Sequence, residues 1–249
     1  MIYQGFAYIY DELMQDAPYE QWNDYLLTII SRHGNGGNKL LDLGCGTGEL
    51  SLKMAGNQFV VTGIDLSGEM LSVAQNKALE NKKNILFLQQ DMRSMNGFQD
   101  PFDVIMICCD SLNYLKSEED VQDTFQAAYQ QLSENGLLIF DVHSLYKIHE
   151  IFSGSTFTDQ NEEISFIWNS YLGDEPNSIE HDMTFFVKQG TTYQRYDEIH
   201  QQRTFSIEQY KTWLEATSLD VLEINSDFEP ASSPHSTTER VFFVAKKSI

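Results

Sequence analysis

A short apolar segment that ends in three alternating glycines constrains the fold of this chain more than any other feature. Residues 39–49 read KLLDLGCGTGE, and the leucines suit a strand that is buried on both faces. Gly44, Gly46 and Gly48 let the backbone turn sharply and come close to a ligand. The segment therefore predicts a strand, a tight turn and a helix start, which is where α/β folds bind nucleotide-like cofactors.

The spacing of the glycines excludes the fingerprint of dinucleotide-binding dehydrogenases, which has glycine at its first, third and sixth positions. Counted from either of the first two glycines, the last position falls on a different residue type, Glu49 or Ser51. An acidic residue followed by three alternating glycines instead resembles the first motif of the class I S-adenosylmethionine (SAM) dependent methyltransferases. In that family the acidic residue, here Asp42, faces the amino end of the methionine part of the cofactor, and the glycines lie at the same site.

A carboxylate at the end of the second predicted strand is a candidate ribose ligand. This strand, residues 59–65, ends on Asp65, about twenty residues beyond the first glycine. At that distance doubly wound nucleotide-binding folds hold a ribose, and a carboxylate can accept hydrogen bonds from two vicinal hydroxyls. Capping the next helix is the competing role, although Ser67 is better placed for it. We therefore expect Asp65 to bind the ribose of the cofactor.

The resemblance implies further cofactor contacts near the ends of the strands. Asp91 follows the third predicted strand, where an acceptor can take the exocyclic amine of adenine and Met92 can pack against the ring. The fourth predicted strand, residues 102–109, ends at Cys109, and in this architecture that end abuts the sulfonium of SAM. Leu66, beside the ribose carboxylate, is expected at the cofactor as well.

The charge balance of the chain predicts a small-molecule acceptor rather than a nucleic acid. The 16 basic and 37 acidic residues give a formal net charge of -21, which repels a polyanion. Residues 110–114 read DSLNY and lack the Asn-Pro-Pro-Tyr or Asp-Pro-Pro-Tyr sequence with which methyltransferases of nucleic-acid amines usually grip the target nitrogen. The chain looks most similar to bacterial small-molecule N-methyltransferases with a β cap, including the aminosugar N,N-dimethyltransferase type.

Few catalytic side chains are obligatory for this chemistry, because methyl transfer from a sulfonium is an in-line displacement that depends mainly on positioning the nucleophile. An amine acceptor must be kept or made neutral, and a hydroxyl acceptor needs a base. His143, His200 and Tyr114 are the candidates by position and residue type. A histidine satisfied within its strand is the alternative for His200. We expect transfer to an amine nitrogen, with O-methylation, RNA or protein methylation, and SAM binding without chemistry as the alternatives.

The regular alternation of strands and helices stops after the fifth predicted strand, residues 137–140, which follows a helix expected to end at Asn135–Gly136. Residues 157–204 then read as three runs of antiparallel β, with a hairpin turn at 188–191. We therefore expect a Rossmann-like, doubly wound α/β sheet of seven strands, the last antiparallel, with an antiparallel β insertion after strand five. The predicted parts are a SAM-binding core with an N-terminal lid (1–145), an antiparallel β cap over the active site (146–205) and a C-terminal segment that completes the core (206–249).

The predicted cap would lie over the carboxyl ends of the sheet, where open α/β folds bind ligands. We expect it to select the substrate, and a homodimer interface is the alternative because its hairpins would leave unpaired sheet edges. Arg195 and Arg203 are scarce cations in this acidic chain and could hold a carboxylate or phosphate of the substrate. They could equally pair with Asp197 or Glu198.

The N-terminal residues 6–11, FAYIYD, resemble the segment that closes over the cofactor in many small-molecule methyltransferases. This resemblance gives Tyr10 a place at the cofactor. A terminal helix docked by its aromatic residues is the alternative interpretation.

The cysteines predict neither a metal site nor a disulfide framework. Cys45, Cys108 and Cys109 have no metal-ligand spacing, and their apolar or glycine-rich surroundings fit reduced thiols in a cytoplasmic protein. No apolar run approaches the length of a membrane span, and the N-terminus lacks the basic region of a signal peptide.

Overall fold

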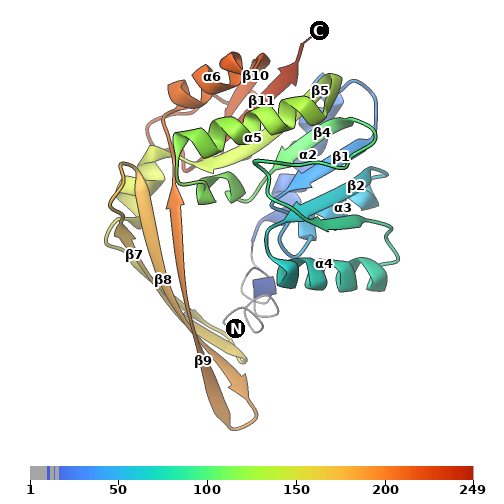
Figure 1. Ribbon diagram of the computed structural model, residues 1–249. Coiled ribbons are helices and arrows are strands. Elements are labelled where there is room, and N and C mark those ends of the chain that lie inside the picture. Colours follow the sequence, from blue (N-terminus) through green and yellow to red (C-terminus); the bar gives the residue numbers. More distant parts are fainter. Residues whose placement is uncertain (1–9, 12–13, 15–16, 249) are drawn as a thin grey trace.

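The large sheet of the protein carries helices on both faces, and a smaller sheet extends away from it (Figure 1). The computed structural model describes residues 10–11, 14 and 17–248. The predicted lid segment 6–11 lies outside these residues, except for its last two positions. In the described part of the chain no helix combines the length and the apolar character needed to cross a membrane.

Seven strands form the large sheet. In chain order they are β1 (Lys39–Leu43), β2 (Val60–Asp65), β3 (Leu86–Gln89), β4 (Phe102–Ile107), β5 (Leu132–His143), β10 (Leu219–Ser226) and β11 (Arg240–Lys247). Their order across the sheet is β10-β11-β5-β4-β1-β2-β3. The pairs from β5 to β3 are parallel, whereas β11 runs antiparallel to both β5 and β10. The predicted Rossmann-like fold with an antiparallel last strand is therefore confirmed.

Helices bury both faces of this sheet. They are α2 (Tyr19–His33), α3 (Glu49–Gly56), α4 (Gly68–Glu80), α5 (Glu118–Gln131) and α6 (Ile207–Ala216). Leu40 packs with the side chains of α2 and α3, whereas Leu41 and Leu43 pack with those of α5 and α6. Because successive strand residues point to opposite faces, a strand covered on both sides needs apolar residues throughout. This explains the run of leucines before the glycine turn.

The helix starts that the sequence predicted are confirmed by their caps. The side chains of Ser67 and Ser117 each accept a hydrogen bond from the backbone N–H three residues further on. Ser206 and Gln209 form the capping box at the start of α6. These caps fix where α4, α5 and α6 begin, and α4 and α5 follow the strand ends that carry the candidate site residues.

The prediction that the helix before the fifth strand ends at Asn135–Gly136 is wrong. Helix α5 ends at Gln131, and β5 begins at Leu132. The pairing of β5 with β4 shifts its register between Leu132 and Leu137, and Asn135 has a left-handed φ of 59°. These turn-forming residues therefore mark an irregularity within the strand, which the sequence pattern alone does not distinguish from a helix end.

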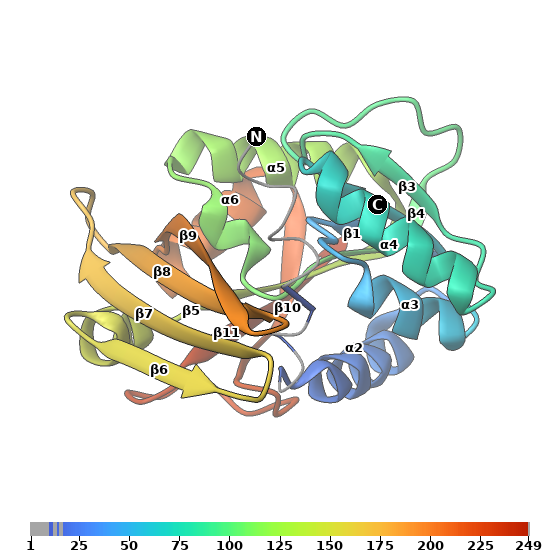
Figure 2. The ribbon, with the colours of Figure 1, turned by 90° about the horizontal axis from the view of Figure 1, so that it is seen from below.

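The smaller sheet, named the cap below, follows β5 and a short π-helix, η2 (Lys147–Phe152). Its antiparallel strands, adjacent in chain order, are β6 (Thr156–Gln160), β7 (Ile164–Leu172), β8 (Ser178–Gln189) and β9 (Thr192–Arg203). The antiparallel insertion after strand five is confirmed, with four strands where the sequence indicated three runs. Figure 2 shows the cap on one side of the view and α2, α3 and α4 on the other.

The edge strand of the cap, β9, is joined to the core. The core contributes a short 3₁₀ helix, η1 (Ser111–Tyr114), which follows β4. Within η1, Asn113 donates a side-chain hydrogen bond to the carbonyl of Arg203 at the end of β9. The cap is thus connected to the carboxyl end of β4 by contact as well as by the chain.

Candidate active site

The glycine turn after β1 leaves space in which a ligand can approach. Gly44, Gly46 and Gly48 have positive φ values of 71°, 52° and 77°. A Cβ added at Gly44 would lie 2.8 Å from Cβ of Ser111, and one at Gly48 would lie 3.0 Å from a side chain of α4, so packing requires these two glycines. A Cβ at Gly46 would meet no atom of the described chain within 4 Å. The glycine turn therefore has room for a cofactor against the backbone of Gly46.

Asp65, at the end of β2, stabilises the same turn through hydrogen bonds. Its Oδ2 accepts a hydrogen bond from the backbone N–H of Gly46 at 2.8 Å, and its Oδ1 accepts one from Ser67 at 2.8 Å. Burial raises the pKa of Asp65 more than these hydrogen bonds lower it. Each carboxylate oxygen has a second lone pair, so the side chain can still accept from ribose hydroxyls.

Asp42, beneath the turn, is a buried carboxylate without a cationic partner in the described chain. Its Oδ2 accepts a hydrogen bond from Oγ of Ser51 at 2.6 Å. Burial raises the pKa of Asp42 to about 7, the hydrogen bond from Ser51 lowers it, and the charge of Asp65 raises it. A cationic amine nearby would favour the ionised form. The two carboxylates, Asp42 and Asp65, and the open position at Gly46 are chemically compatible with the amino end and the nucleoside of SAM, and the role of each residue stays a prediction.

The residues predicted to contact adenine interact with other residues of the protein. Asp91 accepts hydrogen bonds on both carboxylate oxygens from the guanidinium of Arg93, which also pairs with Asp120. This pairing lowers the pKa of Asp91. Met92 packs against the core, and Leu66 is exposed. The adenine role of Asp91 stays a prediction, and the ion pair with Arg93 is a competitor that the sequence did not indicate.

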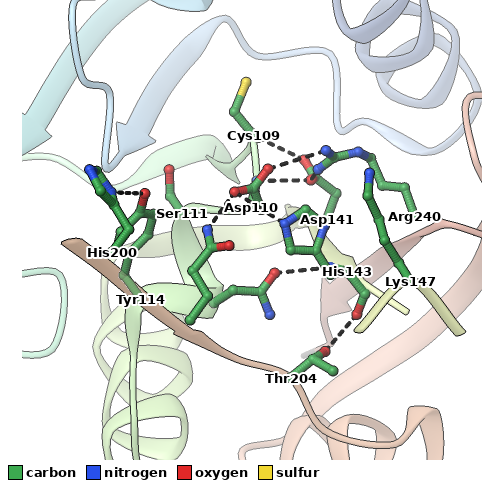
Figure 3. A network of polar contacts seen from close by, with 12 residues as sticks. Cys109, Asp110, Ser111, Tyr114, Asp141, His143, Lys147, His200, Thr204 and Arg240 are labelled. Carbon is green, nitrogen blue, oxygen red and sulfur yellow. Dashed lines mark hydrogen bonds and ion pairs between the residues drawn. The ribbon is translucent and has the colours of Figure 1, made fainter. Parts of the chain in front are cut away.

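Asp141, on β5, holds the turn that follows β4. Its carboxylate accepts hydrogen bonds from the backbone N–H groups of Cys109 and Asp110 at 2.9 and 3.0 Å. It also accepts from Nε1 of Trp22 at 2.9 Å. Figure 3 shows its contact with the guanidinium of Arg240. Cys109 and Asp110 have φ values of 56° and 52°, a conformation that costs energy for residues other than glycine. Asp141 and its partners therefore stabilise a strained turn at the carboxyl end of β4.

The side chain of Asp110 lies at the centre of a polar network between the core and the cap (Figure 3). Its Oδ1 is 3.2 Å from Nη2 of Arg240, and its Oδ2 accepts a hydrogen bond from Gln202 of β9 at 2.7 Å. Burial acts to raise its pKa, but the charges and hydrogen bonds of His143, Arg240 and Gln202 outweigh it and hold the pKa well below its usual range. Asp110 is therefore ionised, and 22% of its side chain stays accessible.

His143 is buried behind Asp110. Its Nε2 lies 3.5 Å from Oδ2 of Asp110, and its backbone N–H donates to Asn113. Nδ1 is buried without a hydrogen-bond partner among the described residues. Burial lowers the pKa of His143 more than Asp110 raises it, so the ring is neutral near pH 7. This geometry presents neither ring nitrogen to a substrate, and the catalytic role of His143 stays a prediction that the contacts do not favour.

Tyr114 and His200 meet across the boundary between core and cap. The Tyr114 hydroxyl lies 2.8 Å from Nδ1 of His200, and Tyr114 is 47% exposed (Figure 3). Burial lowers the pKa of His200, although the charge of Asp110 raises it in part. The structure thus brings together two of the three predicted catalytic residues and adds Asp110 beside them.

The described part of the N-terminal segment reaches the same region. The pKa of Tyr10 is raised first by burial and then by nearby acidic groups, which include Cys109, Tyr114 and Asp110. Asp11 accepts a hydrogen bond from Oγ1 of Thr47 within the glycine turn. These interactions bring Tyr10 and Asp11 close to the ends of β4 and β1, and the lid role stays a prediction.

The two arginines of the cap lie away from this network. Arg195 forms an ion pair with Asp197 at 2.7 Å on the outward face of the cap. Arg203 donates to the backbone carbonyls of Pro176 and Lys116. Of the two interpretations of these cations, structural pairing therefore describes both better than an anion site.

Three site residues were not foreseen as candidates from the sequence: Asp110, Asp141 and Arg240. Asp110 and Asp141 each follow a buried run, which was a usable signal for a carboxylate at the carboxyl end of a strand. Arg240 gave no signal, because it meets Asp141 through the antiparallel pairing of β11 with β5, 99 residues apart in sequence.

Sequence similarity to known methyltransferases extends over the whole chain. A family described as a methyltransferase domain matches residues 40–136. A putative methyltransferase of Bacillus subtilis (strain 168), YqeM, is 50% identical over 248 residues, which cover 100% of this chain and 98% of the relative.

The fold is similar to solved methyltransferase structures as well. A crystal structure of a SAM-dependent methyltransferase from Clostridium acetobutylicum has 30% identity and a TM-score of 0.89, with 99% of each chain covered. The SAM-bound structure of CalS10, an amino pentose methyltransferase from Micromonospora echinaspora, has 17% identity and a TM-score of 0.77, with 97% of this chain and 96% of that chain covered, and supports the fold alone. Taken with the glycine turn and its two carboxylates, these similarities show that the chain belongs to the class I SAM-dependent methyltransferases, with SAM as its cofactor.

Proposed function

We propose that this enzyme transfers the methyl group of SAM to an amine nitrogen of a small molecule bound between the core and the cap. The observation that carries the proposal is the hydrogen-bonded pair of Tyr114 and His200, which lies beside the ionised Asp110 at the carboxyl end of β4. In open α/β folds ligands bind at this end of the sheet. SAM supplies an electrophilic methyl group when it is bound.

Tyr114 is placed to orient the amine. In the neutral His200 tautomer whose Nδ1 carries no proton, the Tyr114 hydroxyl donates to Nδ1 and keeps oxygen lone pairs that can accept the N–H of an amine. This contact directs the nitrogen lone pair away from Tyr114, as an in-line displacement requires. Methyl transfer leaves a positive charge on the nitrogen, and the ionised Asp110 stabilises that charge as it develops.

The charges around the site favour a neutral or cationic acceptor over an anionic one. Arg195 and Arg203 pair elsewhere, and the cap presents Glu198, a carboxylate, on the same face of β9 as His200. The description of CalS10 as an amino pentose methyltransferase supports an amino compound as the acceptor class. An acceptor that carries an ammonium and hydroxyl groups would suit these surroundings.

The cofactor proposal assigns the amino end of SAM to Asp42 and its ribose to Asp65. In this arrangement Gly46 lies against the cofactor, and Gly44 and Gly48 shape the turn. The remaining contacts that we propose come from Tyr10, Leu66, Asp91, Met92 and Cys109.

We further propose that the chain works as a core (1–145), a substrate-selecting cap (146–205) and a C-terminal segment (206–249) in the cytoplasm, where its free cysteines would stay reduced. The outward face of the cap exposes Tyr171, Tyr193 and Ile199 and is the candidate surface for a homodimer.

A labelling experiment tests the proposed function. The protein is incubated with trideuteromethyl SAM and a bacterial cell extract that retains small molecules, RNA and protein, and labelled products in each fraction are found by mass spectrometry. We expect a labelled amine that disappears with Tyr114→Phe and persists with Tyr171→Phe, a matched change on the outward face of the cap. Label in RNA or protein alone would contradict a small-molecule acceptor, and SAM binding without labelled product would indicate a regulator.

A further inference from the structure

Glu198 is a buried carboxylate for which the described chain supplies no partner. The residue is 6% exposed. No hydrogen bond or ion pair of the described residues includes it. A buried carboxylate without a counterion is costly, so one that persists in a binding region indicates a group that arrives from outside.

The strand geometry directs Glu198 toward the core. Side chains alternate along β9, so Glu198, His200 and Gln202 share one face. His200 contacts Tyr114, and Gln202 contacts Asp110, both of the core. Glu198 therefore lies on the core-facing side of the cap, one strand repeat from the proposed methyl-transfer site.

A second carboxylate of the core acts on Glu198. Glu69, in the first turn of α4, has its Oε2 buried without a hydrogen-bond partner among the described residues. Burial raises the pKa of Glu198, and the charge of Glu69 raises it further. The charge of a core carboxylate thus acts on a carboxylate of the cap across their boundary.

No lysine or arginine of the protein neutralises this pair. Every lysine and arginine lies between residues 32 and 247, within the described part, and residues 1–31 contain none. None of these cations pairs with either carboxylate. A ligand that carries a positive charge would supply the counterion that these lysines and arginines do not.

We propose that Glu198 and Glu69 form a second subsite of the acceptor pocket, which binds a cationic nitrogen of the substrate remote from the nitrogen that is methylated. The inference rests on the proposed function and assigns the substrate class as a compound with two amino groups. Two residues along a strand span roughly 6.5 Å, so the two nitrogens lie several bonds apart. A diaminoalkane of about five carbons has this reach.

Paired probes test the subsite by binding alone. The protein saturated with S-adenosylhomocysteine is titrated with 1,5-diaminopentane and with 1-aminopentane by calorimetry. We expect the diamine to bind at least about tenfold more tightly, with the difference abolished in Glu198→Gln. Glu180→Gln is the matched control, because Glu180 lies on the opposite face of the cap and is paired with Gln201. This variant should keep the preference.

A second measurement guards against a folding artefact. Because Glu198→Gln removes an unpaired buried charge, it should leave the thermal midpoint of the ligand-free protein unchanged or raise it. A lowered midpoint would mean that Glu198 is satisfied within the protein, and would overturn the subsite. Equal binding of the two amines, a preference that survives Glu198→Gln, or no diamine binding at about 1 mM would overturn it too.

The failure of the proposed function has a different signature. If diamine binding depends on Glu198 but no amine accepts a methyl group from SAM, the subsite is supported and the proposal of amine methylation is contradicted. If amines are methylated with no preference for the diamine, the proposal of amine methylation is supported and the subsite is contradicted.

Discussion

The hydroxyl of Tyr114 lies 2.8 Å from Nδ1 of His200, and this hydrogen bond joins the 3₁₀ helix after β4 to the edge strand of the cap. Tyr114 belongs to the core and His200 to the cap, so the contact forms only when the cap is docked on the core. Cap position and the chemistry of the site are therefore linked through one pair of side chains.

The Tyr114–His200 pair should act as a unit in catalysis. Tyr114→Phe removes the hydroxyl that orients the amine, and His200→Gln removes its acceptor, so each should lower kcat by about 10²-fold with SAM affinity kept. The double variant should lose little more than the worse single variant. Steady-state kinetics and calorimetry check this with the identified acceptor. Losses that multiply in the double variant would show that the two residues act independently.

The large sheet could be predicted from the sequence because its signals are local. The leucines of β1, the glycine turn and the carboxylate that ends β2 each carry their meaning within a few residues. The helix caps at Ser67 and Ser117 were readable for the same reason. A local pattern is misleading when two kinds of structure have it. Asn135–Gly136 is typical of a helix end but lies within β5.

The polar network between β4, β5 and β11 could not be predicted in this way. Arg240 reaches Asp141 and Asp110 through strand pairing, and no sequence spacing encodes that register. The sequence indicated His200 as a candidate, but its contact with Tyr114 depends on how the cap docks. The sequence pattern therefore indicated which residue types occur near the site, but only the folded structure shows which of them are in contact.

Cofactor affinity should depend on the ionisation of Asp42. Burial raises its pKa to about 7, so its contribution to the stability of the ligand-free protein is largest at low pH and is lost as pH rises toward that value. The cationic amine of SAM favours the ionised carboxylate, so SAM affinity should rise by up to about tenfold per pH unit below that pKa. Calorimetric titrations at about pH 5.5 and about pH 7 measure this slope, which Asp42→Asn should remove. An equal slope in wild type and variant would exclude this role.

Asp65 should contribute to SAM affinity through the ribose. Losing its charge-assisted hydrogen bonds in Asp65→Ala should weaken binding by about 1.5–3 kcal/mol. Because Asp65 also braces Gly46, the ribose contact is separated by comparing S-adenosylhomocysteine with its 2′-deoxy analogue. The wild type should prefer the hydroxylated ligand, and Asp65→Ala should bind both equally. A preference that survives the substitution would assign the ribose to another residue.

Asp141 should be important for stability. Asp141→Asn removes the charge that neutralises Arg240 inside the core and disturbs the acceptor for the backbone of Cys109 and Asp110. We expect a loss of about 3–5 kcal/mol in the free energy of unfolding, measured by denaturant titration. Asp197→Asn, which breaks the exposed pair with Arg195, should leave the unfolding midpoint unchanged. Equal effects of the two substitutions would contradict the structural role of Asp141.

The atom that receives the methyl group tests the central claim most directly. The purified protein is supplied with SAM carrying a ¹³C-labelled methyl group and the acceptor identified from the extract, and the carbon chemical shift and coupling of the product are measured by NMR. The account predicts a methyl carbon bonded to nitrogen in the wild-type product and little product from Tyr114→Phe. A methyl carbon bonded to oxygen would contradict amine methylation.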